Sequence, residues 1–300
     1  MMNYYKVIFL SIIILMIAGC SKDDSAPTET ENPTPITIEK SSKRGLAYNL
    51  TNAADLDTLK SGVSWWYNWA KTTTAPENYY SDYQMEFIPM LWGGNTSTSD
   101  MTTIKNFILA HSEIKYLLVM NEPNLTDQAN RTPYEAATDW VKYEQVINDL
   151  AAQGRTVYLV GPAMSWGTME NYSDPVVWLD DFYKAYKSAN DGNVPQIDYL
   201  AFHWYDYGLA AQLDRLQKYG KKIWITEMAN WNSQINTYEK QAAQMTEMVN
   251  ICETRDDVFR YAWFIGRGTY PDSKHTYLFD ANPGQLNTLG KLYISLPYTN

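Results

Sequence analysis

The chain has 300 residues, enough for one large domain or two small ones. Its 34 acidic and 24 basic residues give a formal net charge of -10, which argues against nucleic acid and anionic glycans as partners, because both favour basic grooves. Eleven Trp and 24 Tyr are many for this length, and several of them fall where a core does not need them.

The N-terminal 42 residues differ in character from the rest. Lys6 precedes the apolar stretch 7–19, which is too short to cross a bilayer but long enough for the core of a signal peptide. The stretch closes on small residues followed by Cys20. It resembles a bacterial lipoprotein signal, which implies that residues 1–19 are removed and Cys20 is lipidated; an ordinary secretory peptide is the alternative.

Residues 20–42 would then form a disordered tether, since they are rich in Ser, Thr, Pro and charge with little to bury. The Ser-Lys-Asp-Asp that follows Cys20 resembles the export tag of Bacteroidetes surface lipoproteins. This resemblance implies a protein anchored in the bacterial outer membrane and exposed on the cell surface.

From residue 43 to 300 a short apolar run, a polar loop and a segment with helical spacing alternate. Strands are predicted over 44–49, 63–69, 85–93, 116–123, 156–164, 197–205, 222–229 and 261–266. Helices are predicted over 52–60, 100–112, 133–153, 175–189, 209–219, 237–254 and 284–296. The link 72–84 is expected to be a loop or a short helix. Helix starts are expected at Asp100, Thr132 and Asp174, and helix ends at Gly154 and Gly220.

Eight apolar strands that alternate with helices imply an all-parallel sheet buried on both faces. At this length the pattern predicts an α/β fold with a single (β/α)8 TIM barrel over 43–300, rather than an open doubly wound sheet. No Gly-rich phosphate fingerprint follows the first strand, which also disfavours a Rossmann fold. Cys252 is the one cysteine besides Cys20 and is predicted to be packed in a helix.

Two acids stand at the C-terminal strand ends, which form the active-site rim of such a barrel. Glu122 ends the run YLLVMNE and Glu227 ends IWITE, and their strands lie across the barrel mouth from each other. Cleavage of a glycosidic bond needs two facing carboxylates, one to protonate the leaving oxygen and one to stabilise or attack the anomeric carbon. The other rim residues are largely aromatic or amide, which suits sugars because a pyranose has an apolar C–H face. They are Tyr48, Asn49, Tyr67, Asn68, Trp69, Trp92, Asn121, Ser165, Trp166, His203, Trp204, Tyr205 and Trp263.

Five segments carry a more specific resemblance. They are FIPMLWG (87–93), NEPN (121–124), IDYLAFHWY (197–205), IWITEMANW (223–231) and YAWFIG (261–266). In this order they resemble glycoside hydrolase family 128, compact barrels of the retaining Glu/Glu clan that act on β-1,3-glucans. The resemblance implies Glu122 as acid/base and Glu227 as nucleophile. It further implies Asn121 as ligand of the sugar 2-hydroxyl, Tyr205 as partner of the nucleophile, and Trp263 in the floor under the reacting sugar.

Further expectations concern the rest of the rim. Sugar platforms are expected at Trp69, Trp92, Trp166 and Trp231, and further substrate contacts at Tyr48, Asn68 and His203. His111, His203 and His275 have no metal-binding spacing, so neither metal nor cofactor is expected. Asp206 is expected to be a solvated loop acid, and Glu86 is expected to lie at the opposite rim. Because side chains alternate along a strand, at most one of Trp65 and Trp66 can face the interior. Residues 265–283 either wall the cleft or form a surface excursion.

The sequence therefore predicts a surface-tethered, monomeric, retaining hydrolase of β-1,3-glucan or its oligosaccharides. Two other functions stay open. One is a glycan-binding lipoprotein that has lost turnover, and the other is the same chemistry on another β-linked glucan, mannan or xylan. Endo or exo action is left undecided.

Overall fold

The computed structural model describes residues 37–269 and 272–299, so the predicted signal peptide, Cys20 and most of the predicted tether lie outside the described part. One compact unit runs from Ile38 to the C-terminus. It begins before the expected boundary at residue 43, because Ile38 N donates to Gln84 Oε1 at 3.0 Å and Ser41 is buried.

Within the described residues, nine parallel strands form one sheet in the order β3-β2-β1-β9-β8-β7-β6-β5-β4. The strands are β1 (Arg44–Ala47), β2 (Trp65–Tyr67), β3 (Glu86–Phe87), β4 (Met90–Leu91), β5 (Tyr116–Val119), β6 (Tyr158–Met164), β7 (Tyr199–Trp204), β8 (Ile223–Met228) and β9 (Val258–Trp263).

The two ends of this order, β3 and β4, are halves of the single strand predicted over 85–93. Ile88 N donates to Trp66 O of β2 at 2.9 Å, and Leu118 N of β5 donates to Pro89 O at 3.0 Å. The same short segment thus pairs with both neighbours and closes the sheet, which confirms the predicted barrel.

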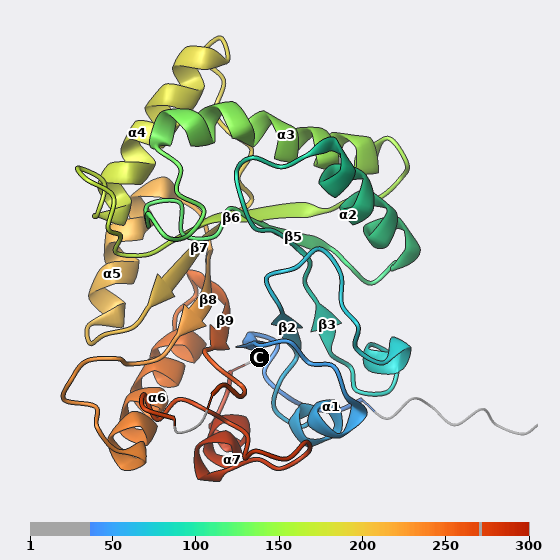
Figure 1. The fold of residues 1–300 in the computed structure, drawn as a ribbon, viewed down its shortest axis with the longest axis vertical. Helices are drawn as coiled ribbons and strands as arrows, with labels where there is room; N and C mark the ends of the chain where they lie inside the picture. Colours follow the sequence, from blue (N-terminus) through green and yellow to red (C-terminus); the bar gives the residue numbers. More distant parts are fainter. Residues whose placement is uncertain (1–36, 270–271, 300) are drawn as a thin grey trace, which may run out of the picture. The chain divides into compact units, whose positions relative to one another are not determined.

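Helices surround this sheet, as Figure 1 shows. They are α1 (Ala53–Leu59), α2 (Thr98–Ala110), α3 (Pro133–Ala151), α4 (Pro175–Ala189), α5 (Leu209–Leu216), α6 (Tyr238–Thr254) and α7 (Thr288–Ser295). The 3-10 turn η2 (Gln217–Tyr219) extends α5. The link between β2 and β3 holds a single 3-10 turn, η1 (Glu77–Tyr79), as its composition predicted.

Two of the three predicted helix starts are confirmed. Thr132 and Asp174 cap α3 and α4, each followed by a proline. The prediction that Asp100 starts a helix is wrong, because Ser97 is the cap of α2 and Asp100 completes its capping box at the third position. Gly220 ends η2 in the left-handed conformation with φ 63°, as expected.

The core has two layers. Trp65 and Trp224 pack inside the barrel, while Trp66 packs outward under the helices, so one of the paired tryptophans faces inward as predicted. At the N-terminal end the Arg260 guanidinium lies 4.9 Å from the ring of Trp224 and pairs with Glu86 at 2.7 Å. Glu86 therefore lies at the rim opposite the strand ends that carry Glu122 and Glu227, as expected.

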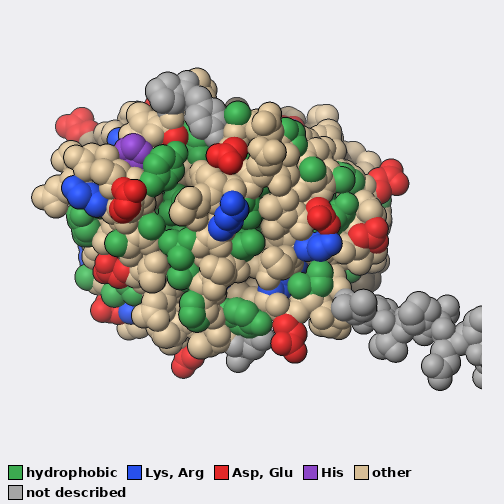
Figure 2. All heavy atoms as spheres, turned by 90° about the horizontal axis from the view of Figure 1, so that it is seen from below, with side chains coloured by type: hydrophobic (Ala, Val, Ile, Leu, Met, Phe, Trp, Pro, Cys, Tyr) green, Lys and Arg blue, Asp and Glu red, His purple; other side chains and the backbone are tan. Residues whose placement is uncertain are grey.

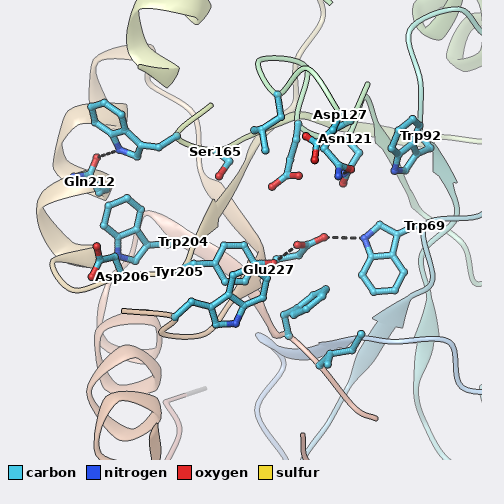
Figure 3. Close-up of a pocket in the computed structure, with 17 residues that line it drawn as sticks. Trp69, Trp92, Asn121, Asp127, Ser165, Trp204, Tyr205, Asp206, Gln212 and Glu227 are labelled. Atoms are coloured by element: carbon cyan, nitrogen blue, oxygen red, sulfur yellow. Dashed lines mark hydrogen bonds between the residues drawn. The ribbon is translucent and has the colours of Figure 1, made fainter. Parts of the chain in front are cut away.

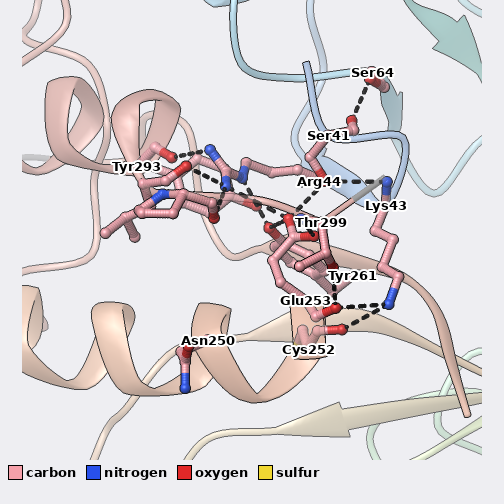
Figure 4. A network of polar contacts seen from close by, with 12 residues as sticks. Ser41, Lys43, Arg44, Ser64, Asn250, Cys252, Glu253, Tyr261, Tyr293 and Thr299 are labelled. Atoms are coloured by element: carbon pink, nitrogen blue, oxygen red, sulfur yellow. Dashed lines mark hydrogen bonds and ion pairs between the residues drawn. The ribbon is translucent and has the colours of Figure 1, made fainter. Parts of the chain in front are cut away.

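A buried ion pair joins the barrel to its outer helices (Figure 4). Glu253 of α6 accepts hydrogen bonds from Ser41 Oγ and Tyr261 OH, both at 2.6 Å, and lies 3.5 Å from Arg44. Arg44 also donates to the carbonyl of Tyr293 at 2.7 Å. The network therefore ties the first strand to both C-terminal helices.

The described residues contain no helix with the length and hydrophobicity needed to cross a membrane. Figure 2 shows one face on which hydrophobic side chains are scattered among acidic and basic ones. Cys252 is free and buried, as predicted.

Candidate active site

A cleft of about 1030 Å³ lies over the C-terminal strand ends (Figure 3). Aromatic and polar side chains from every side of the rim line it. They are Trp69, Trp92, Asn121, Glu122, Leu125, Asp127, Gln128, Ser165, Trp166, Trp204, Tyr205, Asp206, Gln212, Glu227, Trp231, Phe264 and Ile265. The two predicted glutamates thus share one cleft with all four predicted tryptophan platforms.

Three donors hold the carboxylate of Glu227. Tyr67 OH donates to Oε1 at 2.8 Å, Trp69 Nε1 donates to the same oxygen at 2.7 Å, and Tyr205 OH donates to Oε2. Burial, followed by the charge of Glu227, raises the pKa values of Tyr67 and Tyr205 well above the usual value, so both phenols stay protonated and donate. Three donors fit an ionised carboxylate, which can only accept hydrogen bonds. The expected contact of Tyr205 with this glutamate is present.

Backbone geometry presents Glu122 to the cleft. Met120 and Glu122 have φ values of 57° and 45°, in the left-handed region that residues other than glycine seldom adopt. Hydrogen bonds to neighbouring strands fix this turn, with Asn121 N donating to Trp92 O and Glu122 N to Ala163 O, both at 2.8 Å. Unfavourable backbone conformations of this kind persist where the surroundings fix them, and they cluster at active sites.

His203 lies beneath both carboxylates. Its Nδ1 is 2.8 Å from Oε1 of Glu122 and 3.4 Å from Oε2 of Glu227. Burial lowers the pKa of His203, but the two carboxylates raise it by more, so the net shift is upward. The prediction that His203 contacts substrate is wrong, because its side chain is fully buried and outside the cleft lining. It positions the glutamates instead.

The same three residues offer one ligand atom each within 4.8 Å of one another, a spacing that could also hold a metal ion. The hydrogen bonds argue otherwise. Both oxygens of Glu227 already accept donors, and Nδ1 of His203 is engaged with Glu122. The hydrogen bonds of these three residues therefore argue against a metal ion between them.

Other contacts prepare the platforms for stacking. Trp166 is 45% exposed, its Nε1 donates to Gln212 at 3.2 Å, and the Arg215 guanidinium lies 5.3 Å from its ring. Trp231 stacks on Tyr205 with centroids 4.0 Å apart. These contacts hold each ring in place, which would lower the entropy cost of binding at the predicted platforms.

Three further predicted substrate residues do not line the cleft. Trp263 is fully buried outside the barrel and donates to Thr276 O at 2.9 Å, so the prediction that it forms part of the floor is wrong. Side chains alternate along a strand, and the next residue, Phe264, lines the cleft. Tyr48 instead accepts a hydrogen bond from Arg267, and the amide of Asn68 donates to Asn49.

The structure also adds site residues to those that the sequence assigned. Tyr67, expected on the rim but without a role there, donates a hydrogen bond to Glu227. Asp206 is exposed as expected, yet it lines the cleft. Other additions lie on loops or on a helix and carry no sequence signal. They are Leu125, Asp127, Gln128 and Gln212.

Of the described part of 265–283, Ile265 alone lines the cleft. Arg267 turns instead toward α1, where its Nη1 pairs with Asp55 Oδ2 at 3.2 Å. This supports the surface excursion rather than the wall.

The sequence and the fold of this chain are similar to those of known glycosyl hydrolases. A family profile described as the glycosyl hydrolase catalytic core matches residues 45–293. A crystal structure of a GH128 subgroup II endo-β-1,3-glucanase from Pseudomonas viridiflava is 53% identical, with a TM-score of 0.81 over 87% of this chain and 100% of that one. The subgroup II endo-β-1,3-glucanase from Sorangium cellulosum is 31% identical, with a TM-score of 0.72 over 86% of this chain and 100% of that one.

A subgroup III curdlan-specific exo-β-1,3-glucanase from Blastomyces gilchristii, in complex with glucose, is 29% identical, with a TM-score of 0.63 over 85% of this chain and 98% of that one. Among curated proteins, none matches the chain.

Proposed function

Because the chain belongs to glycoside hydrolase family 128 and is a β-glucan hydrolase, we propose that it cleaves β-1,3-glucan by double displacement, with Glu122 as acid/base and Glu227 as nucleophile. The β-1,3 linkage and internal cleavage are proposed from the two subgroup II relatives, both described as endo-β-1,3-glucanases. Arg267 pairs with Asp55 of α1, and none of residues 266–269 lines the cleft, which supports a groove that is open on this side.

The spacing of the carboxylates carries the mechanistic proposal. An oxygen of Glu122 and one of Glu227 lie within 4.8 Å. Retaining glycosidases hold their carboxyl groups about 5–5.5 Å apart, while inverting ones need about 6.5–9.5 Å to admit a water between acid and base. Two of their oxygens at most 4.8 Å apart support the retaining reaction.

In the first step Glu122 donates its proton to the glycosidic oxygen while Glu227 attacks the anomeric carbon, and the C–O bond to the leaving sugar breaks. In the second step Glu122 takes a proton from water, whose oxygen displaces Glu227 from the anomeric carbon. The hydrogen bonds from Tyr67, Trp69 and Tyr205 orient Glu227 for attack. They also stabilise the carboxylate when it leaves.

The test replaces each glutamate by alanine in turn and adds azide as an external anion. With an activated aryl β-laminaribioside, we expect azide to rescue Glu227→Ala and to give the α-glycosyl azide, since azide attacks the substrate directly. Azide should rescue Glu122→Ala through the enzyme-bound intermediate and give the β-glycosyl azide. NMR distinguishes the two anomers, and the reverse pattern would exchange the two roles. Wild-type enzyme should first release the β-anomer, and initial release of the α-anomer would exclude retention.

We also propose that Cys20 carries a lipid and anchors the protein to the outer surface of the bacterial outer membrane. The support is the pattern of an apolar stretch, small residues and a cysteine, followed by an acidic tag. Labelling cells with a radioactive fatty acid should mark the wild-type protein and not Cys20→Ser. Protease added to intact cells should degrade the wild-type protein, and protection of the protein would refute surface exposure.

A further inference from the structure

A side pocket of about 340 Å³ adjoins the cleft at the ends of β2 and β4. The two spaces share Trp69 and Trp92 in their walls. Figure 3 shows both rings on the same side of the cleft, opposite Trp204 and Gln212. The indole rings of Trp69 and Trp92 therefore border both the cleft and this pocket.

The pocket combines an apolar floor with a polar border. Met90 and Leu91 form buried parts of its lining, and Thr72, Asn95 and Asp100 supply polar groups. Pockets for drug-sized ligands start at about 300 Å³, so this one has room for only a small group. Aromatic faces beside hydrogen-bonding groups are the chemistry that binds a sugar ring.

An ion pair lies in the lining of the pocket and outside that of the cleft. Lys71, from the loop after β2, contacts Asp100 in the first turn of α2, and both side chains line the pocket. The hydrogen bond from Lys71 is the largest cause that lowers the pKa of Asp100 to about 2, so the pair stays charged through the neutral range. A glucan backbone that entered here would meet this ion pair. A single sugar substituent would end at it.

Resting on the proposed function, we propose that the side pocket binds a single glucosyl branch carried by the β-1,3-glucan backbone in the cleft. The primary 6-hydroxyl is the natural attachment point, since it projects from the ring on a rotatable bond. The backbone would pass Trp69 and Trp92 on the cleft side while the branch entered between them. The enzyme would then accept substituted glucan, with the branch contributing to binding.

The test compares two substrates of equal backbone length: linear laminarihexaose, and laminarihexaose with one 6-O-β-glucosyl unit on an internal residue. Ala70→Phe places a ring in the pocket, because Ala70 lines it, is exposed and lies outside the cleft lining. We expect at least a tenfold loss of kcat/KM on the branched substrate and less than a twofold change on the linear one. Equal loss on both substrates, or no loss on either, would overturn the proposal.

A second variant keeps the pocket open but removes its positive charge. Lys71→Met should lower kcat/KM on the branched substrate alone, by about threefold to tenfold, as loss of one hydrogen-bonding group of about 1 kcal/mol predicts. Lys105→Met is its matched control, since Lys105 forms a similar ion pair with Asp149 at 2.5 Å and lies outside the pocket. An equal fall in the ratio of kcat/KM on the branched to the linear substrate in Lys71→Met and Lys105→Met would refute the role of Lys71. Cleavage of the linear substrate by wild-type enzyme tests the proposed function separately.

Discussion

Removing the Tyr67 hydroxyl tests how far the hydrogen bonds to Glu227 support catalysis. Tyr67 is fully buried, and its OH donates to Oε1 of Glu227 at 2.8 Å. A hydrogen bond to a charged group is worth about 1.5–3 kcal/mol, and a tenfold change in rate corresponds to about 1.4 kcal/mol. Tyr67→Phe should therefore lower kcat/KM on laminarihexaose by about 10-fold to 150-fold.

The chain contains a matched control for this change. Tyr261 is also fully buried, and its OH donates at 2.6 Å to another buried carboxylate, Glu253, away from the cleft (Figure 4). Tyr261→Phe should lower the melting temperature about as much as Tyr67→Phe, while leaving kcat/KM unchanged. Initial rates and thermal unfolding measured on both variants separate the two effects.

The refuting result is a folded Tyr67→Phe variant that keeps more than a third of wild-type kcat/KM. In that case the bonds from Trp69 and Tyr205 would suffice to hold Glu227. A loss of activity matched by Tyr261→Phe would likewise refute the reasoning, because it would reflect general destabilisation.

Three further predictions concern buried polar groups. Glu253→Ala leaves Arg44 without its charged partner and should lower the free energy of unfolding in urea by about 3–5 kcal/mol; less than 1 kcal/mol would contradict this. The raised pKa of His203 means that its stabilisation is present below its unfolded value of about 6.5 and is lost as pH rises through the folded value. His203→Gln should therefore lower the free energy of unfolding by more at about pH 6 than at about pH 9. An equal decrease at both pH values would refute an upward shift of the His203 pKa. Gln241 is buried and forms hydrogen bonds with both the backbone N and O of Asn230, the neighbour of the predicted platform Trp231. Gln241→Ala should therefore raise KM about fivefold and leave kcat nearly unchanged. A fall in kcat alone would exclude this positioning role.

Local patterns in the sequence determined the fold and the proposed catalytic pair. Apolar runs of strand length alternating with helical segments predict a parallel barrel, because only a sheet covered on both faces buries such strands. Once the barrel is known, Glu122 and Glu227 must share a rim, since parallel strands all end on the same side. These inferences depend only on period and order along the chain, and the structure confirms that both glutamates line one cleft.

Tertiary structure decided which neighbours of the pair act on it and which residues meet the substrate. His203 and Trp263 occupy strand ends that looked like rim positions, yet His203 is buried beneath the two glutamates and Trp263 packs outside the barrel. Tyr67 reaches Glu227 from a strand 160 positions away in the chain. The side pocket exists because a loop after β2 meets the start of α2, a contact between distant segments that no local pattern encodes.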